Sequence, residues 1–112
     1  MSSLIITVCE GNDCDADEIG EIPGAGRIKV FETKGKKWKY IASIRLPQSL
    51  HFMDYSGIDI NNKNILAITS QVSSALWTGE LDVDNWKIVD HGHVYKFPKD
   101  KNGNMIYLIF RA

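Results

Sequence analysis

The chain has 112 residues, enough for one domain with a single core and too few for a second folding unit. Hydrophobic residues make up 44% of the chain and charged residues 24%, as in ordinary globular proteins. A net charge of -1 creates no overall field for nucleic acid or an anionic membrane, and no apolar run approaches the roughly 20 residues of a membrane-spanning helix. We therefore expect one domain over residues 1–112, with neither nucleic acid nor a membrane as partner.

The N-terminal residues lack the features of a secretory signal. The first apolar run is only about five residues long, and no Lys or Arg precedes it. A reducing, cytoplasmic location is therefore the default expectation. Cys9 and Cys14 would be thiols in that location, whereas an oxidising compartment would allow a disulfide between them.

The hydrophobic pattern predicts strands. Apolar residues alternate or form short blocks, and they almost nowhere recur at the spacing of an amphipathic helix. The predicted strands are Leu4–Cys9, Arg27–Glu32, Trp38–Leu46, Ser56–Ile60, Asn64–Ser70, Ala75–Asp82, Trp86–Asp90, His93–Phe97 and Met105–Phe110. Turn-forming clusters rich in Gly, Asn, Asp and Lys lie at 33–36, 61–64, 82–85 and 101–104. The sequence therefore predicts a meander of antiparallel strands.

The two halves of the chain resemble each other. Segments align at a shift of 61 residues (Ser3–Glu10 with Asn64–Gln71) and of 48 residues (Arg27–Glu32 with Ala75–Glu80, Lys37–Ile41 with Asn85–Val89). The difference of 13 residues makes the loop 11–26 an insertion in the first copy. We expect two blade-like repeats, 1–47 and 48–112, with the insertion as a place to build a binding site.

Several stretches are similar to a known family. They are Cys9–Asn12, Gly26–Arg27, Asp54–Gly57, Ser70–Gln71, Ser74–Gly79 and Val94–Pro98. Together they resemble a largely uncharacterised family of β-propeller-like proteins over nearly the whole chain. The resemblance implies a propeller-type fold and no activity. In the family the pattern continues into further strands after Tyr107, whereas this sequence ends at Ala112.

A closed propeller is excluded by length, because it needs at least about four blades and this chain supplies about two. The predicted fold class is all-β, an antiparallel meander of two blade-like repeats arranged as a partial β-propeller or a small β-sandwich. Open strand edges are then available for self-association or for a protein partner. Residues 52–60 form the innermost strand of the second copy in this interpretation.

Charge is unevenly distributed along the first copy. Residues 1–26 hold six acidic side chains and no basic one. Residues 27–47 hold seven basic side chains and one acidic side chain, Glu32. We expect the acidic loop to fold over the basic hairpin and neutralise it, in preference to a basic patch for a polyanion.

The acidic loop is also the candidate metal site. Asp13, Asp15 and Asp17 place carboxylates at every second position, a spacing with which oxygen ligands can wrap a calcium ion. The loop lacks the Gly and the final acidic ligand of an EF-hand at their required places. A solvated acidic loop without a cofactor is the favoured interpretation, and calcium is the alternative.

No catalytic residue is assigned. Ser56 lies in Asp54–Gly57 and lacks the Gly-x-Ser-x-Gly elbow of a nucleophilic serine. Trp38, Trp77 and Trp86 are expected to be packing residues in preference to stacking platforms for bases.

The sequence favours a propeller-like binding or interaction module that contacts a protein or small ligand through the loop 11–26. The candidate ligand-binding residues are Glu10, Asn12, Asp54 and Tyr55. The alternative is a calcium-dependent, hydrolase-like propeller fragment with the ion among Glu10, Asn12, Asp13 and Asp54.

Overall fold

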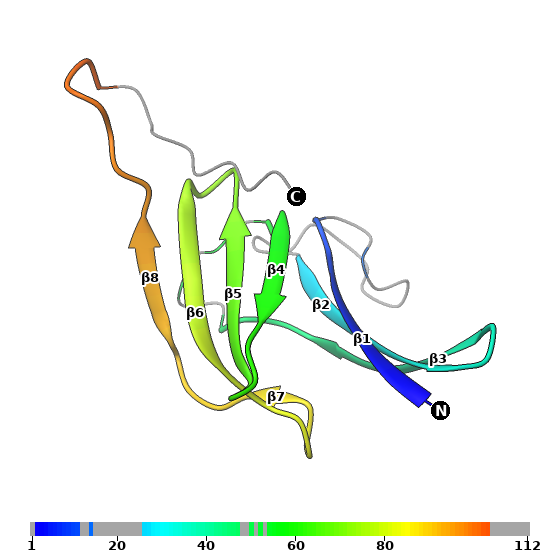
Figure 1. Cartoon of the computed structure of the whole chain (residues 1–112). Helices are drawn as coiled ribbons and strands as arrows, with labels where there is room; N and C mark the ends of the chain where they lie inside the picture. Colours follow the sequence, from blue (N-terminus) through cyan, green and yellow to red (C-terminus); the bar gives the residue numbers. More distant parts are fainter. Residues whose placement is uncertain are drawn as a thin grey trace.

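The computed structural model describes residues 2–11, 14, 26–47, 50, 52 and 54–103. Within these ranges the protein consists of β-strands in two antiparallel sheets, which confirms the all-β class (Figure 1). The strands are β1 Ser2–Cys9, β2 Arg27–Lys34, β3 Lys37–Ile44, β4 Gly57–Ile60, β5 Ile65–Ser70, β6 Ala75–Asp82, β7 Lys87–Ile88 and β8 His93–Lys96. A helix long and apolar enough to cross a membrane is not found in this part of the chain.

The first sheet has the order β1-β2-β3. All eight residues of β1 pair with β2, from Ser2 opposite Lys34 to Cys9 opposite Arg27. A tight turn at Gly35 joins β2 to β3, and its φ of 62° is a conformation that glycine adopts without strain. A bulge between Val30 and Phe31 shifts the pairing with β3 in mid-strand.

The second sheet has the order β4-β5-β6, and both β7 and β8 pair with the far edge of β6. Strand β7 pairs with the end of β6 at Leu81 and Asp82, and β8 pairs with its first half. The strand predicted at Trp86–Asp90 is therefore only two residues long, because residues 83–86 form a turn in which Trp86 has a φ of 54°. The side chain of Asn85 stabilises this turn with a hydrogen bond to Asp82.

The Asp82 carboxylate caps that turn. It accepts hydrogen bonds from Asn85 Nδ2 (3.0 Å) and from the backbone nitrogens of Asp84 and Asn85 (2.9 and 3.1 Å). These bonds, with the side-chain bond from Asn85 as the largest cause, lower the pKa of Asp82 below its usual value.

The two sheets share one core. It contains Ile28, Val30, Ile44 and Leu46 from the first sheet and its exit, Phe52 and Tyr55 from the connection, and Leu66, Ile68, Ala75, Trp77 and Leu81 from the second sheet. Trp77 is the largest fully buried side chain, and its Nε1 donates a hydrogen bond to the carbonyl oxygen of His91 (2.9 Å). Each sheet therefore has an inner face, which forms the core, and an outer face. The predicted strand Met105–Phe110 lies outside the described residues.

Candidate binding surface

Asp54 lies immediately before β4, and its side chain is only 6% exposed. The carboxylate accepts hydrogen bonds from Ser70 Oγ, from Ser56 Oγ (3.0 Å) and from the backbone nitrogen of Val72 (3.1 Å). Ser70 is fully buried, and its Oγ accepts a bond from the backbone nitrogen of Ser73 (3.1 Å). Asp54 therefore fixes the turn between β5 and β6 to the entrance of β4.

Tyr55 joins the two sheets. Its backbone nitrogen donates to the carbonyl oxygen of Glu10 (3.0 Å), and its hydroxyl accepts a bond from the backbone nitrogen of Leu46 (2.7 Å). The ring packs against Gly26, where an added Cβ atom would lie 2.5 Å from it. Burial raises the pKa of Tyr55 above the usual 10.0. This one residue thus contacts the segments that leave β1, enter β2 and leave β3.

Three of the four predicted ligand-binding residues lie at this joint. Asp54 and Tyr55 are buried and bonded to the chain itself, whereas the Glu10 side chain is exposed. Asn12 lies outside the described residues, as do the predicted calcium ligands Asp13, Asp15 and Asp17. Their roles stay predictions. Among the residues that are described, three or more His, Cys, Asp or Glu side chains never gather closely enough to hold a metal.

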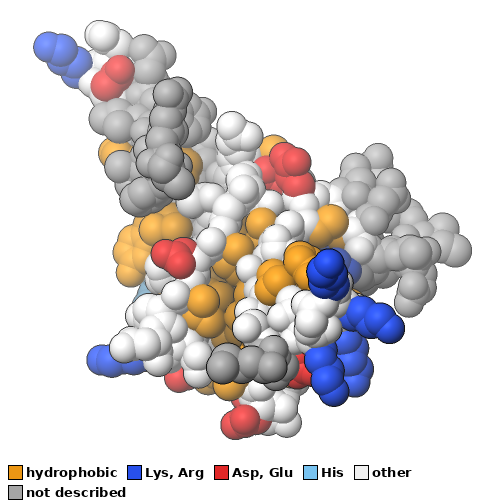
Figure 2. Space-filling view, turned by 45° about the vertical axis from the view of Figure 1, so that its right-hand side comes forward, with side chains coloured by type: hydrophobic (Ala, Val, Ile, Leu, Met, Phe, Trp, Pro, Cys, Tyr) orange, Lys and Arg blue, Asp and Glu red, His pale blue; other side chains and the backbone are white. Residues whose placement is uncertain are grey.

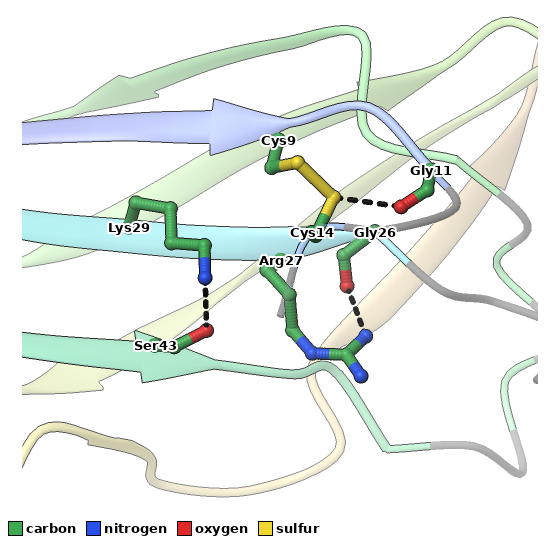
Figure 3. Close-up of a disulfide and its surroundings, with 7 residues drawn as sticks. All are labelled: Cys9, Gly11, Cys14, Gly26, Arg27, Lys29 and Ser43. Carbon is green, nitrogen blue, oxygen red and sulfur yellow. Dashed lines mark hydrogen bonds between the residues drawn. A yellow bond between two sulfur atoms is a disulfide. The ribbon is translucent and has the colours of Figure 1, made fainter. Parts of the chain in front are cut away.

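A disulfide joins Cys9, the last residue of β1, to Cys14, with 5.7 Å between their Cα atoms (Figure 3). The expectation of two thiols is therefore wrong for this structure. Cys9 pairs across the sheet with Arg27, which is buried and donates a hydrogen bond to the carbonyl oxygen of Gly26 (2.9 Å). Disulfides persist mainly in oxidising compartments, and the cytoplasmic location stays a prediction.

The outer face of the first sheet carries a cluster of aromatic rings. The Phe31 ring centroid lies 5.6 Å from that of Trp38 and 6.2 Å from that of Tyr40. Trp38 is 61% exposed and Tyr40 is 56% exposed. Ile5 pairs with Phe31 across β1 and β2 and so shares this face. We call Ile5, Lys29, Phe31, Trp38 and Tyr40 the aromatic face.

The exposure of Trp38 corrects the expectation that it is a packing residue. Trp38 lies near the end of the β2–β3 hairpin, which extends away from the second sheet (Figure 1). It points to the outer side, where none of the described strands covers it. Trp77 is fully buried, as expected, and Trp86 packs partly against the core.

Lys29 is the lysine placed beside the rings of the aromatic face, because Lys37 and Lys39 alternate with Trp38 and Tyr40 and so point to the other side of the sheet. Lys29 Nζ lies 5.9 Å from the Tyr40 ring centroid, within reach of a cation–π interaction, and donates a hydrogen bond to Ser43 Oγ (2.9 Å). Four further lysines of the hairpin are exposed: Lys34, Lys36, Lys37 and Lys39. Figure 2 shows Lys and Arg side chains gathered on one side of the molecule, beside exposed hydrophobic ones. The acidic loop expected to neutralise them lies mostly outside the described residues.

The rings of the aromatic face are inclined to one another. The Phe31 ring is inclined by 47° to Trp38 and by 70° to Tyr40. Inclined rings form an uneven apolar surface.

The outer face of the second sheet is hollow. Gly57, Asp59, Ala67, Thr69 and Leu76 line an open depression of about 560 Å³, together with neighbouring Ser56 and Ile58. The side chains of Gly57, Asp59, Ala67 and Thr69 are short, and Asp59 is exposed at the depression. Longer side chains lie around them on the same side of the sheet: Leu76, its partner Tyr95 on β8, which is 54% exposed, and Ile65. We call Gly57, Asp59, Ala67, Thr69 and Leu76 the hollow face.

The sequence analysis missed both faces. The signal was present for the aromatic face, because Lys29, Phe31 and Thr33 alternate with the buried Ile28 and Val30 along β2. Reading that alternation as two different faces would have placed Phe31 on the outer side.

Comparison with known proteins adds no relative. No protein-family model, no curated protein and no solved structure matches this chain. The resemblance to β-propeller-like proteins therefore stays a prediction, and the function has to be argued from the surface of the molecule.

Proposed function

We propose that this protein is a non-catalytic interaction module that binds another protein through the aromatic face. The observation that carries the proposal is the exposure of Trp38 and Tyr40 beside Phe31. Aromatic side chains bury about 150–250 Å² each, at roughly 25 cal/mol per Å² of apolar area. Trp and Tyr are also the residues on which binding energy concentrates at protein interfaces. Covering this cluster is therefore strongly favourable.

The positive charge of Lys29 at the cluster favours a partner with an acidic surface. Lys29 lies on the face itself, whereas Lys34, Lys37 and Lys39 point to the other side of the hairpin. Charges at the rim of an interface mainly raise the association rate and make it sensitive to salt. We therefore expect binding that weakens as the ionic strength rises, with apolar contacts at its centre.

Of the two serines bonded to Asp54, the buried Ser70 is not accessible to a substrate. A serine nucleophile needs an activating base and access to substrate. Ser70 is fully buried and donates to Asp54, and Ser56 donates to the same carboxylate. The calcium-dependent hydrolase stays an untested alternative, because most of its proposed ligands lie outside the described residues. Binding through the loop 11–26 likewise stays a prediction.

Site-specific photocrosslinking tests the proposal. A photoreactive phenylalanine analogue replaces Trp38 in one protein and Val89 in a control, since Val89 is 50% exposed but follows β7, away from the first sheet. We expect discrete protein adducts from position 38 and none from position 89. Adding Tyr40→Ser to the first protein should lower the adduct yield several-fold. Equal adduct patterns from both positions, or no adduct from position 38, would contradict the proposal.

A further inference from the structure

We infer that the protein bound by the aromatic face is a second copy of this chain, which receives it on the hollow face. This inference rests on the proposed function of the aromatic face and names the partner. It follows from the direction in which equivalent residues of the two sheets point, and from the shape and charge of the two outer faces.

Equivalent residues of β2 and β6 point to opposite sides of their sheets. In β2, Ile28 and Val30 point into the shared core. The shift of 48 residues predicted from the sequence carries Ile28 onto Leu76, which lines the hollow face. It also carries Lys29 of the aromatic face onto Trp77, which lies in the core. Inner residues of the first sheet therefore correspond to outer residues of the second, and the reverse.

Strands β1 and β5 give the same result with their own shift of 61 residues. Ile6 packs against the core, and the shift carries it onto Ala67 of the hollow face. Ile5 of the aromatic face is carried onto Leu66, which is fully buried. Both pairs of equivalent strands thus give the same result: the side of the first sheet that faces the core is equivalent to the side of the second sheet that faces away from it. The two sheets are therefore stacked front to back.

Among the described residues, front-to-back stacking leaves one surface of each kind without a covering strand. We call the side of the first sheet that carries Ile28 and Val30 its front, and the equivalent side of the second sheet, which carries Leu76, its front as well. Inside the chain, the front of the first sheet packs against the back of the second. The hollow face is then a front, and the aromatic face a back, that no described strand covers. A second copy that continues the stacking would bring the hollow face of one chain against the aromatic face of the next.

Shape and charge agree with this pairing. Where the first sheet places Ile6 and Val8 in its core, the second sheet places the smaller Ala67 and Thr69 on the hollow face. The space so left, about 560 Å³, is open to aromatic rings of a neighbour. Lys29 lies on the aromatic face and Asp59 on the hollow face, so the two surfaces carry opposite charges.

The contact joins two different surfaces. An open assembly of any length therefore has an unpaired aromatic face at one end and an unpaired hollow face at the other. Such a heterologous contact produces either a closed ring or a filament. Rings of stacked sheets typically close with about four to eight sheets, which corresponds to about two to four copies of this chain. The exposed rings cover only part of the roughly 800 Å² per partner of a standard interface, so we expect assembly in the micromolar range.

Sedimentation equilibrium with two complementary variants tests this inference. Trp38→Ser with Tyr40→Ser removes the aromatic face, and Ala67→Arg with Thr69→Arg fills the hollow face. We expect the mass of the wild-type protein to rise with concentration and each variant alone to remain monomeric. Mixed together, the two variants should form a one-to-one pair, because each supplies the face that the other lacks. Val89→Ser is the control and should assemble like the wild type.

Each other outcome contradicts the inference. Variants that still assemble alone would show that strand edges or other surfaces mediate association, and a mixture that does not pair would show that the two faces do not meet. If the arginine variant fails to fold, the exposed Asp59→Lys takes its place and should weaken assembly several-fold. A wild-type protein that stays monomeric while position 38 crosslinks to a different protein would overturn the second-copy inference and leave the proposed function standing.

Discussion

The two sheets share one core and differ in what their outer faces present. The first sheet presents inclined aromatic rings with Lys29, and the second presents a hollow over Gly57, Ala67 and Thr69 beside Leu76. Trp77 and Trp38 make the contrast concrete, since the former is 0% exposed and the latter 61%. The side of the sheet on which a tryptophan lies therefore decides whether it packs in the core, as Trp77 does, or is exposed on the surface, as Trp38 is.

The largest expected difference is between two single variants, in which Trp77 or Trp38 is replaced by alanine. Trp77→Ala removes the largest buried side chain and its hydrogen bond to His91, and should lower the free energy of unfolding by about 3–5 kcal/mol. Trp38→Ala should change it by no more than about 0.5 kcal/mol. Urea denaturation followed by circular dichroism measures both. Equal losses would show that Trp38 packs in the folded chain.

A second pair of variants replaces two aspartates, Asp54 before β4 and Asp59 within it. Asp54→Ala leaves Ser70 and the Val72 nitrogen without their acceptor, and should cost roughly 2–3 kcal/mol of unfolding free energy. Asp59→Ala lies on the exposed hollow face and should cost at most about 0.5 kcal/mol. The same denaturation experiment decides. A small loss for Asp54→Ala would mean that its hydrogen-bond network contributes little to stability.

The disulfide is a constraint of the first sheet with no counterpart described in the second. Closing so short a loop should contribute about 2 kcal/mol. We expect reduction with dithiothreitol to lower the melting temperature of the wild type. The variant with Cys9→Ser and Cys14→Ser should melt at the lower temperature with or without reductant. An unchanged wild-type melting temperature would contradict a stabilising bond.

The joint between the sheets predicts a smaller, pH-dependent effect. Tyr55→Phe removes the acceptor of the Leu46 nitrogen and should cost about 1–2 kcal/mol at neutral pH. The folded pKa of Tyr55 is raised, so the stability it contributes is full below pH 10.0 and is lost as pH rises through the folded pKa. The difference in unfolding free energy between wild type and variant should therefore shrink in alkaline solution. A difference that grows there would reverse the sign and contradict the buried, neutral phenol.

The smallest expected effect concerns calcium. Because a solvated acidic loop is the favoured interpretation of Asp13, Asp15 and Asp17, adding calcium or EDTA should leave the melting temperature unchanged. A ligand that binds the folded state raises this temperature by mass action. A clear rise with millimolar calcium would therefore establish a site in the loop.

Much of the fold follows from the sequence. Strand β6 was predicted with its observed bounds, and β1, β2 and β5 within about two residues at each end, because alternation and turn residues are local signals. The strand at Trp86–Asp90 was too long, since the cap formed by Asp82 and the turn it stabilises override local strand preference. The sheet pairing of β8 with β6 is a long-range contact that no local pattern encodes.

The site was harder to predict. Sequence reasoning brought Asp54 and Tyr55 to attention, but their burial depends on partners distant in the chain, such as Ser70 and Leu46. It treated Trp38 and Trp86 as equivalent because the repeat aligns them. Their different exposure arises because Trp38 lies on the outer side of its sheet, whereas Trp86 packs against the core. The side that faces the core is a property of the assembled fold and not of either repeat.

The central claim is that the aromatic face of one chain is covered by the hollow face of another. Oxidative footprinting of the wild-type protein over a dilution series tests it most directly, with the exposed His91 as an internal reference outside both faces. We predict that oxidation of Trp38 and Tyr40 slows as concentration rises, while oxidation of His91 stays constant. Oxidation of Trp38 and Tyr40 at the same rate at every concentration would contradict the account.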